Sequence, residues 1–398
     1  MTANIPQPVP PAGPGPLRQF EIYLQGAMAG AKPAVPIAFA ELERQAREKL
    51  APEAYAYIAC GAGFEHTVEE NTAAFARWRI VPRMLRDVAA RDLSIELFGR
   101  KLATPLLVAP IGVQELAHKD ADLATAKAAA AERVPMIFSN QASVPMETMA
   151  QAMGDQPRWF QLYWSKSDEL VASLVRRAEA CGCDAIVVTL DTTLLGWRTR
   201  DLDYAYLPFI RGMGLAQYTS DPAFRAMLKK PPEEDMLAAA QLFMTIYSNP
   251  ALTWDKLAFL RQHTSKPILL KGINRQNDAR KALDLGIDGI VVSNHGGRQV
   301  DGARASLDAL DEIARAVGGR LPLLFDSGIR GGAGIFKALA LGATAVCIGR
   351  PYVYGLAIAG EAGVRAVLRN MIADLDLTMG TAGCASIKEI NRDMLARV

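Results

Sequence analysis

The sequence predicts an α/β fold, a (β/α)₈ TIM barrel with an N-terminal helical cap and a long insertion after strand 4. Short apolar runs with the length of buried parallel strands recur from residue 105 onward, and segments with helical periodicity separate most of them. There are eight such runs, and eight β-then-α units in about 250 residues is the size expected of this barrel. A doubly wound open sheet is the alternative, but it gives no reason for the units to stop at eight.

The predicted strands are short and mostly aliphatic or aromatic. They cover residues 105–112, 134–140, 158–164, 185–191, 267–273, 289–294, 322–328 and 345–350. The helix after the third run has the clearest pattern, because Leu170, Leu174 and Ala178 share one face. Gly182 then ends that helix.

The chain before the barrel divides into a tail and a cap. Residues 1–19 begin with a proline-rich stretch that lacks a regular series of backbone donors, so we expect a flexible tail there. Residues 20–104 are the predicted cap. It contains one helix from Phe39 to about Leu50 and another that carries Tyr55 to Ala59.

The fourth and fifth predicted strands are separated by residues 192–266, far more than one helix and two loops require. This insertion leaves from the carboxyl end of a strand, on the face where barrel active sites are built. We interpret it as a lid over the site. A contact between subunits is the alternative.

Composition narrows the classes of partner. Lys and Arg total 44 against 42 Asp and Glu, so the formal net charge is only +2. A charge this small does not favour binding to nucleic acid or to an anionic membrane. No apolar run approaches the roughly 20 residues that span a bilayer, and no secretory signal pattern is present, so we expect a cytoplasmic protein. The five cysteines are scattered, and Cys181 and Cys183 are too close for a zinc knuckle, so no metal site is predicted.

Polar residues gather where the apolar runs end. Because the carboxyl ends of barrel strands form one rim, these residues should be neighbours in space. They are Gln161, Tyr163, Thr189, Asp191, Lys271, Ser293, His295, Asp326, Gly349 and Arg350.

The segment 293–299, Ser-Asn-His-Gly-Gly-Arg-Gln, is the most informative part of this rim. Its glycines allow backbone to approach a ligand closely. His295 can accept a proton from a small 2-hydroxy acid, while Arg298 can hold its carboxylate through a forked ion pair. Asp191 is the candidate that orients His295.

Two loops near the end of the chain suggest a phosphate site. Residues 326–332 follow the seventh strand and Gly349 with Arg350 follows the eighth, the positions that often hold phosphate in barrels. Backbone N–H groups at a helix start and the guanidinium groups of Arg330 and Arg350 suit a phosphomonoester. A plain tight turn is the alternative. No Gly-x-Gly-x-x-Gly follows a strand and no Walker A loop is present, which argues against NAD and ATP.

From about Phe20 to the C-terminus the chain resembles the FMN-dependent 2-hydroxy acid oxidases and dehydrogenases, which include glycolate oxidase, lactate oxidase and the flavin domain of flavocytochrome b₂. The segment 293–299 is among the most specific marks. Residues 20–26, residues 196–202 and the long insertion are most similar to the lactate 2-monooxygenase branch. The resemblance implies that residues 20–398 form a single FMN-binding barrel domain.

The resemblance assigns roles by matching position. Tyr57 and Arg298 would bind the substrate carboxylate with help from Arg198, and Tyr163 would bond the substrate hydroxyl. His295 would be the base and Asp191 its partner. Towards the flavin ring and its polar edge the matching residues are Pro110, Ile111, Gly112, Ser139, Gln161, Thr189, Lys271 and Ser293. Towards the ribityl chain and phosphate they are Asp326, Gly328, Arg330, Gly349 and Arg350.

Three departures from the family pattern are visible. Gly112 stands where glycolate oxidase has an alanine beside the flavin, and Gln141 stands where it has an active-site tryptophan. Both changes bear on substrate size. Residues 326–328 read Asp-Ser-Gly in place of the commoner Asp-Gly-Gly.

The activity that the resemblance implies is FMN-dependent oxidation of a small L-2-hydroxy acid, first of all L-lactate and O₂ to acetate, CO₂ and water. An oxidase that releases the 2-keto acid and H₂O₂, or a dehydrogenase with another electron acceptor, is the alternative. A flavin-binding barrel without catalysis is a third reading, which the presence of His295, Asp191, Tyr57 and Arg298 opposes. The family also implies a homotetramer or homo-octamer.

Overall fold

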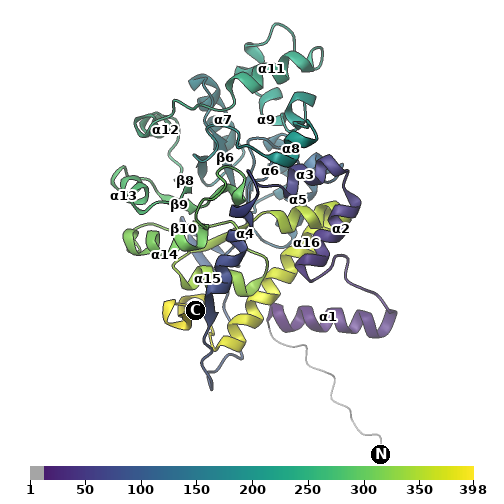
Figure 1. Ribbon diagram of the computed structural model, residues 1–398, viewed down its shortest axis with the longest axis vertical. Coiled ribbons are helices and arrows are strands. Elements are labelled where there is room, and N and C mark those ends of the chain that lie inside the picture. The colour runs from purple at the N-terminus through teal and green to yellow at the C-terminus, as the bar shows by residue number, and fades with distance from the viewer. Residues whose placement is uncertain (1–12) are drawn as a thin grey trace, which may run out of the picture.

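The computed structural model describes residues 13–398 and confirms the closed eight-stranded barrel (Figure 1). All neighbouring strands are parallel, in the order β4 to β11 around the barrel and back to β4. Each strand lies inside one of the predicted apolar runs. The strands are β4 (Leu106–Val108), β5 (Met136–Phe138), β6 (Arg158–Tyr163), β7 (Ile186–Thr189), β8 (Ile268–Ile273), β9 (Gly289–Val292), β10 (Leu323–Phe325) and β11 (Ala345–Ile348).

Helices surround the barrel and alternate with its strands. They are α5 (Ala121–Ala131), α6 (Met146–Met153), α7 (Asp168–Ala180), α12 (Leu257–His263), α13 (Gln276–Asp284), α14 (Ser306–Val317), α15 (Gly332–Ala340) and α16 (Arg350–Ala382). The predicted helix after the third strand is α7, which Ser167 caps through a bond from the Leu170 N–H. Helix α16 is broken at Ala359 and Gly360, whose backbone angles are not helical. Short 3₁₀ turns cover Ala74–Arg77, Gln114–Leu116, Pro208–Arg211, Trp254–Lys256, His295–Gly297, Ile387–Glu389 and Arg392–Met394.

A hairpin closes the amino end of the barrel. Strands β2 (Ile95–Leu97) and β3 (Arg100–Leu102) pair antiparallel, and Phe98 at their turn packs edge-on against Trp159 with ring centroids 5.6 Å apart. The aliphatic interior of the barrel lies directly behind these rings. With this end filled, only the carboxyl end can receive a ligand.

The cap consists of α1 (Pro14–Ala29), α2 (Phe39–Lys49), α3 (Pro52–Ala59) and α4 (His66–Ala73). Helices α2 and α3 match the predicted cap helices. Helix α1 lies against α16 at the lower right of Figure 1, and α3 and α4 lie over the barrel. Strand β1 (Trp78–Ile80) pairs antiparallel with β12 (Leu395–Arg397) and so joins the cap to the C-terminus.

The predicted tail is too long. Residues 13–19 were expected to be irregular, yet α1 begins at Pro14. The reason is that Pro14 and Pro16 lie in the first helical turn, where the missing N–H has no partner to lose. The Gly15 N–H, between them, donates to Asp376 of α16 at 2.9 Å. Residues 1–12 of the predicted tail lie outside the described residues.

The insertion of residues 192–266 is folded and packed. It contains α8 (Thr199–Asp203), α9 (Ala216–Thr219), α10 (Pro222–Ala226) and α11 (Met236–Ile246), followed by the barrel helix α12. Tyr218, Phe224 and Phe243 are fully buried in it, and the Tyr218 and Phe243 rings meet edge-on at 4.7 Å. An internal core of this kind makes the insertion a small structural unit attached to the barrel.

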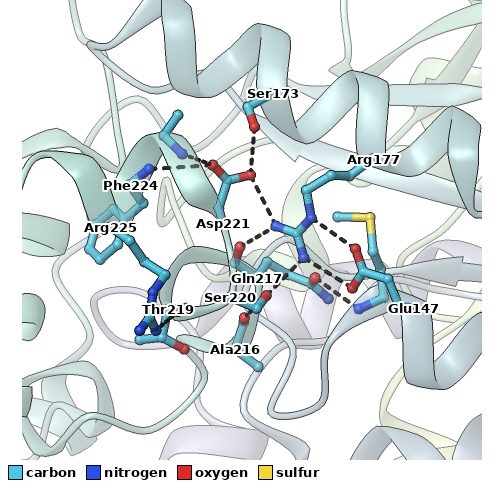
Figure 2. Close-up of polar contacts among 12 residues, drawn as sticks. Glu147, Ser173, Arg177, Ala216, Gln217, Thr219, Ser220, Asp221, Phe224 and Arg225 are labelled. Atoms are coloured by element: carbon cyan, nitrogen blue, oxygen red, sulfur yellow. Dashed lines mark hydrogen bonds and ion pairs between the residues drawn. The ribbon is translucent and has the colours of Figure 1, made fainter. Parts of the chain in front are cut away.

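A polar network anchors this unit to two barrel helices (Figure 2). Arg177 of α7 donates to both carboxylate oxygens of Glu147 of α6, at 2.9 and 3.0 Å. The same guanidinium group donates to the Gln217 carbonyl and to Asp221, which caps α10 and is fully buried. Ser173 also donates to Asp221, at 3.0 Å. The α9–α10 half of the insertion is therefore fixed to the barrel wall.

No helix in the described part of the chain combines the length and the apolar character that a bilayer crossing requires. All five cysteines are unpaired, and four of them are buried.

Candidate active site

A cavity opens at the carboxyl end of the barrel, opposite the hairpin. It lies between the strand ends, the cap and the insertion. Fourteen of the predicted site residues line it: Tyr57, Pro110, Ile111, Gly112, Tyr163, Arg198, Lys271, His295, Arg298, Asp326, Gly328, Arg330, Gly349 and Arg350. The other five, Ser139, Gln161, Thr189, Asp191 and Ser293, are buried or nearly so behind this surface.

His295 and Asp191 form the pair that the sequence predicted. Nδ1 of His295 lies 2.7 Å from Oδ1 of Asp191, so Nδ1 carries the shared proton and Nε2 is the basic nitrogen. Burial lowers the pKa of His295. The charge of Lys271 lowers this pKa further, whereas Asp191 raises it. His295 is thus a neutral base at physiological pH.

Asp191 is held in its charged form. Burial by itself would raise the pKa of this carboxyl, but the charges of Lys271 and His295 outweigh burial and bring the pKa to about 2. The Thr192 hydroxyl also donates a hydrogen bond to Oδ1 of Asp191, at 3.2 Å. A fixed negative charge behind the imidazole stabilises the imidazolium that forms when His295 accepts a proton.

Lys271 sits at the floor of the cavity and is charged. Its Nζ donates to Ser293 Oγ at 2.9 Å and lies 3.4 Å from Asp326 Oδ2 and 3.8 Å from Asp191 Oδ2. Burial opposes the charged form, but the two carboxylates raise the pKa of Lys271 above its ordinary value. A cation at this depth can stabilise negative charge on a bound group.

Arg298 reaches the cap from residues 293–299, the loop that carries the candidate base and that we call the catalytic loop. One nitrogen, Nη1, donates to the carbonyls of Tyr57 and Cys60 at 2.7 and 2.9 Å, and the guanidinium carbon lies 5.2 Å from the centre of the Tyr57 ring. Its Nε and Nη2 make no hydrogen bond with any described residue. The contacts of Nη1 fix the orientation of the guanidinium group, and the edge formed by Nε and Nη2 can bind a carboxylate.

Arg198 and Tyr163 complete the polar wall. Arg198 comes from the insertion and is only 5% exposed, with Nε bound to the Arg298 carbonyl at 3.3 Å and Nη2 to Gln299 at 3.2 Å. Burial and the neighbouring charge of Arg298 lower the pKa of Arg198. Two adjacent guanidinium groups attract an anion into this corner. The Tyr57 and Tyr163 hydroxyls make no hydrogen bond with the described residues and are free to bind a ligand.

On the side of the cavity where β10 and β11 end, Arg330 and Arg350 have no carboxylate partner within the described residues. Burial, with the charges of Arg298 and Arg330, lowers the pKa of Arg350 to about 10. Arg350 donates to the Gly296 and Cys60 carbonyls at 3.0 and 2.9 Å, and its buried Nε has no partner. Enclosed guanidinium groups of this kind suit a phosphate.

The backbone of the phosphate loop fits the prediction in part. Gly328 has φ +94°, and a Cβ there would lie 2.2 Å from the Asn71 carbonyl oxygen, so only glycine fits. The Gly332 N–H at the start of α15, however, already donates to Asp374. The anion site therefore rests on Arg330, Arg350 and the loop rather than on the first N–H of α15.

The buried polar residues match the polar edge of a flavin. Nε2 of Gln161, inside β6, and Oγ1 of Thr189, at the end of the neighbouring β7, are buried and have no hydrogen-bond partner among the described residues. Their unused donors, the cation at Lys271 and the guanidinium groups of Arg330 and Arg350 together fit a planar heterocycle with a phosphorylated tail. Residues 110–112 supply an apolar wall for its ring.

Sequence reasoning missed the aromatic roof of the cavity. Phe209, Tyr247 and Leu195 of the insertion line the cavity, and Phe209 meets Tyr57 edge-on with centroids 6.3 Å apart. No motif marks these residues. The sequence analysis assigned no role to Gln299, the last residue of segment 293–299. Its Nε2 donates to the carbonyls of Asp191 and Leu194 at 2.9 and 2.8 Å. Gln299 therefore connects the start of the insertion to the catalytic loop.

Gly112 does not enlarge the cavity. A Cβ at this position would lie 2.9 Å from both Cβ and the carbonyl oxygen of Gln141. The space left by the glycine is therefore filled by Gln141, which itself lines the cavity. The two departures from glycolate oxidase are coupled by packing.

A flavin-dependent oxidoreductase is the class that this barrel and this site define, and comparison with known proteins agrees. The family model for FMN-dependent dehydrogenase matches residues 46–397. The chain belongs to this family, whose cofactor is FMN. The chain is 45% identical over 383 residues to an FMN-dependent alpha-hydroxy acid dehydrogenase, qulF, of Penicillium citrinum, covering 96% of this chain and 95% of that protein. It is 42% identical over 362 residues to an L-lactate oxidase of Lysinibacillus sphaericus, covering 91% and 93%.

Solved structures agree with the fold. A crystal structure of mandelate oxidase superposes with a TM-score of 0.81 at 39% sequence identity, and the match covers 92% of this chain and 99% of that one. The similarity includes the cap and the barrel together, since so little of either chain lies outside it.

Proposed function

We propose that the protein oxidises a small L-2-hydroxy acid to the 2-keto acid with FMN as cofactor and O₂ as the final electron acceptor, and that L-lactate is its first candidate substrate. The observation that carries this proposal is the convergence of the His295–Asp191 pair and the Arg198–Arg298 pair on one cavity. A base and an anion site side by side are what a 2-hydroxy acid requires.

The residues of the chain divide the work. Nε and Nη2 of Arg298, with Arg198 and the Tyr57 hydroxyl, bind the substrate carboxylate and orient the neighbouring carbon. Nε2 of His295 accepts the proton of the substrate hydroxyl, and Tyr163 bonds the same oxygen. Asp191 stabilises the imidazolium that results.

As His295 takes the hydroxyl proton, the substrate Cα–H bond breaks; FMN, when bound, would supply the acceptor for that hydrogen and its electron pair, and O₂ would then take up both as H₂O₂. Residues 110–112 would lie against its ring, with Ser139, Gln161, Thr189 and Ser293 around the polar edge. Lys271 would place a positive charge beside the part of the ring that gains negative charge on reduction. Asp326, Gly328, Arg330, Gly349 and Arg350 would hold the ribityl chain and phosphate.

The product depends on how long the keto acid stays in the cavity. In the lactate 2-monooxygenase outcome, pyruvate and H₂O₂ remain together and react to acetate, CO₂ and water. In the oxidase outcome, both leave separately. The packed roof of Phe209, Tyr247 and Leu195 favours retention, whereas the similarity to an L-lactate oxidase favours release. Both outcomes share the same oxidation step.

The test is a product analysis under air. Purified protein reconstituted with FMN is supplied with L-lactate, and O₂ uptake, acetate, pyruvate and H₂O₂ are measured together. Acetate equal to the O₂ consumed identifies the monooxygenase, and pyruvate with equal H₂O₂ identifies the oxidase. No O₂ uptake with L-lactate or any other 2-hydroxy acid, together with reduction of an artificial acceptor, would identify a dehydrogenase.

Two further proposals follow from the family and the composition. We propose a homotetramer or homo-octamer in the cytoplasm, acting on small molecules rather than on nucleic acid or membranes. Light scattering of the purified protein measures the assembly, and a single subunit mass would contradict it.

A further inference from the structure

The backbone of the catalytic loop is strained at the proposed base itself. His295 has φ +58°, in the left-handed region that residues with a side chain rarely adopt, and Gly296 follows at φ +65°. Such a conformation persists only where the surroundings fix it. The contacts of the peptide groups on either side of His295 therefore matter to the direction of its imidazole.

Two serine hydroxyls fix these peptide groups. The His295 N–H donates to Ser293 Oγ at 3.0 Å, and the next N–H, of Gly296, donates to Ser327 Oγ at 3.0 Å. Ser293 belongs to the same loop as His295, whereas Ser327 comes from the loop after β10. Ser327 thus connects the N–H group that follows His295 to the end of β10.

Ser327 is itself in a conformation that favours glycine. Its φ is +82°, and it is only 9% exposed. Its hydroxyl donates to Asp326 Oδ1 at 2.8 Å while accepting from Gly296. A serine in a left-handed position is less favourable than glycine, so its presence here indicates that the hydroxyl contributes something that glycine cannot.

These contacts close a ring around the floor of the cavity. Oδ2 of Asp326 lies 3.4 Å from Lys271 Nζ, and Lys271 donates to Ser293 at 2.9 Å. The ring therefore runs through Lys271, Ser293, the His295 and Gly296 N–H groups, Ser327 and Asp326. Among these members, Ser327 alone joins Asp326 to the backbone next to His295.

We propose that Ser327 is a positioning residue, whose hydroxyl holds the strained main chain of His295 and fixes the base relative to Lys271. The inference rests on the proposed function, because it takes His295 as the base. It predicts that removing the hydroxyl slows proton transfer while leaving substrate binding nearly unchanged, since Arg298 and Arg198 lie outside the ring.

The test compares Ser327→Gly with Ser327→Ala. Both remove the hydroxyl, but only glycine relieves the left-handed strain. Arg133→Gly is the matched control, because Arg133 has φ +55°, is exposed and lies far from the ring in sequence and contacts. Thermal melting and FMN absorbance establish that each variant folds and binds the cofactor.

Two readouts are expected to move together. The first readout is the NMR resonance of His295 in FMN-free protein labelled with ¹³C-histidine. Comparison with His295→Gln assigns this resonance among those of the four histidines. It should shift or broaden in both Ser327 variants. In the loaded protein, the rate constant for anaerobic flavin reduction by L-lactate should fall at least about 10-fold with little change in the half-saturating concentration. Arg133→Gly should change neither readout.

A Ser327→Gly variant with the parental resonance and the parental reduction rate would overturn the proposal. A slower reduction with an unchanged resonance would also overturn it, because the effect would then act through Asp326 and Lys271 alone. If the parent is not reduced by any 2-hydroxy acid, the proposed function fails, and the histidine resonance alone decides the role of Ser327.

Discussion

At the scale of single residues, the site combines charges that shift one another. Asp191 lies between His295 and Lys271, so each of the three groups depends on the other two for its protonation state. Burial makes these dependences strong, because the screening by water is lost. The pH dependence of the reaction should therefore change when one charge is removed.

Asp191→Asn tests this coupling. The neutral base is the active form, so kcat/KM falls as the pH drops through the pKa of His295, which lies below its ordinary value of 6.5. Asp191 opposes that lowering, so its removal should move the acidic limb to still lower pH. The maximal rate should also fall at least about 10²-fold, because the imidazolium loses its partner. An acidic limb that stays in place would contradict the assignment.

The two arginines of the polar wall can be separated by substitution. Arg298 offers a free guanidinium edge, which an ammonium group cannot reproduce, so Arg298→Lys should weaken 2-hydroxy acid binding by about 1.5–3 kcal/mol. The flavin spectrum should remain normal. Substrate titration of Arg298→Lys and Arg198→Lys measures the effect, and a loss confined to Arg198→Lys would move the carboxylate site to the insertion.

These residues could be identified from the sequence because their signals are local. Segment 293–299 places a base, an arginine and glycines within one loop, and the strand ends bring in Asp191 and Lys271. The roles of Ser327 and Gln299 could not be predicted, because their partners lie in other loops and only the closed barrel brings them together.

At the scale of elements, the insertion is better described as an anchored roof than as a free lid. Its α9–α10 half is held by Arg177 (Figure 2). Its start is held by Gln299, which donates to the Leu194 carbonyl. Phe209 and Tyr247 reach the cavity from this unit. The positions of these two rings depend on packing with Phe243, which stacks on Tyr247 with ring centroids 4.8 Å apart. The periodicity of the sequence does not predict such packing.

Tyr247→Ala tests the roof. Loss of this ring should open the cavity and shorten the stay of the keto acid, so the share of pyruvate and H₂O₂ should rise at the expense of any acetate. Flavin reduction should change much less, since His295 and Arg298 keep their contacts. Tyr204→Ala is the matched control, because Tyr204 belongs to the insertion, is 52% exposed and does not line the cavity. An equal shift in both variants would exclude a specific role of the roof.

Helix α1 shows a limit of prediction at this scale. The abundance of proline near the start of the chain indicated a tail through residue 19, but two of those prolines occupy the first turn of a helix. Composition describes a stretch as a whole, whereas the helix start is decided by position within it.

At the scale of the whole molecule, we expect the proposed phosphate site to lower the stability of the protein without its cofactor. Arg350 is enclosed without a carboxylate, and the lowering of its pKa to about 10 reflects that environment. An uncompensated buried charge is strongly destabilising, so we expect its replacement with an apolar residue of similar size to be neutral or stabilising. The barrel itself, by contrast, was predictable because eight apolar runs of strand length carry its whole topology.

Arg350→Met should therefore separate stability from cofactor binding. Without FMN the variant should melt at the parental temperature or higher, whereas its FMN affinity should fall by about 1.5–3 kcal/mol. The stabilisation that FMN adds should shrink accordingly. Calorimetric melting with and without FMN measures both quantities, with Arg133→Met as the control for loss of an exposed arginine. A variant that melts lower without FMN and binds it normally would show that Arg350 has a structural role only.

The most direct test of the central claim is anaerobic mixing of the FMN-loaded protein with L-lactate and other L-2-hydroxy acids. The account predicts that the absorbance of oxidised flavin bleaches in the parent and that His295→Gln retains FMN but bleaches at least about 10²-fold more slowly. A parent that no 2-hydroxy acid bleaches, or a His295→Gln variant that bleaches at the parental rate, would contradict it.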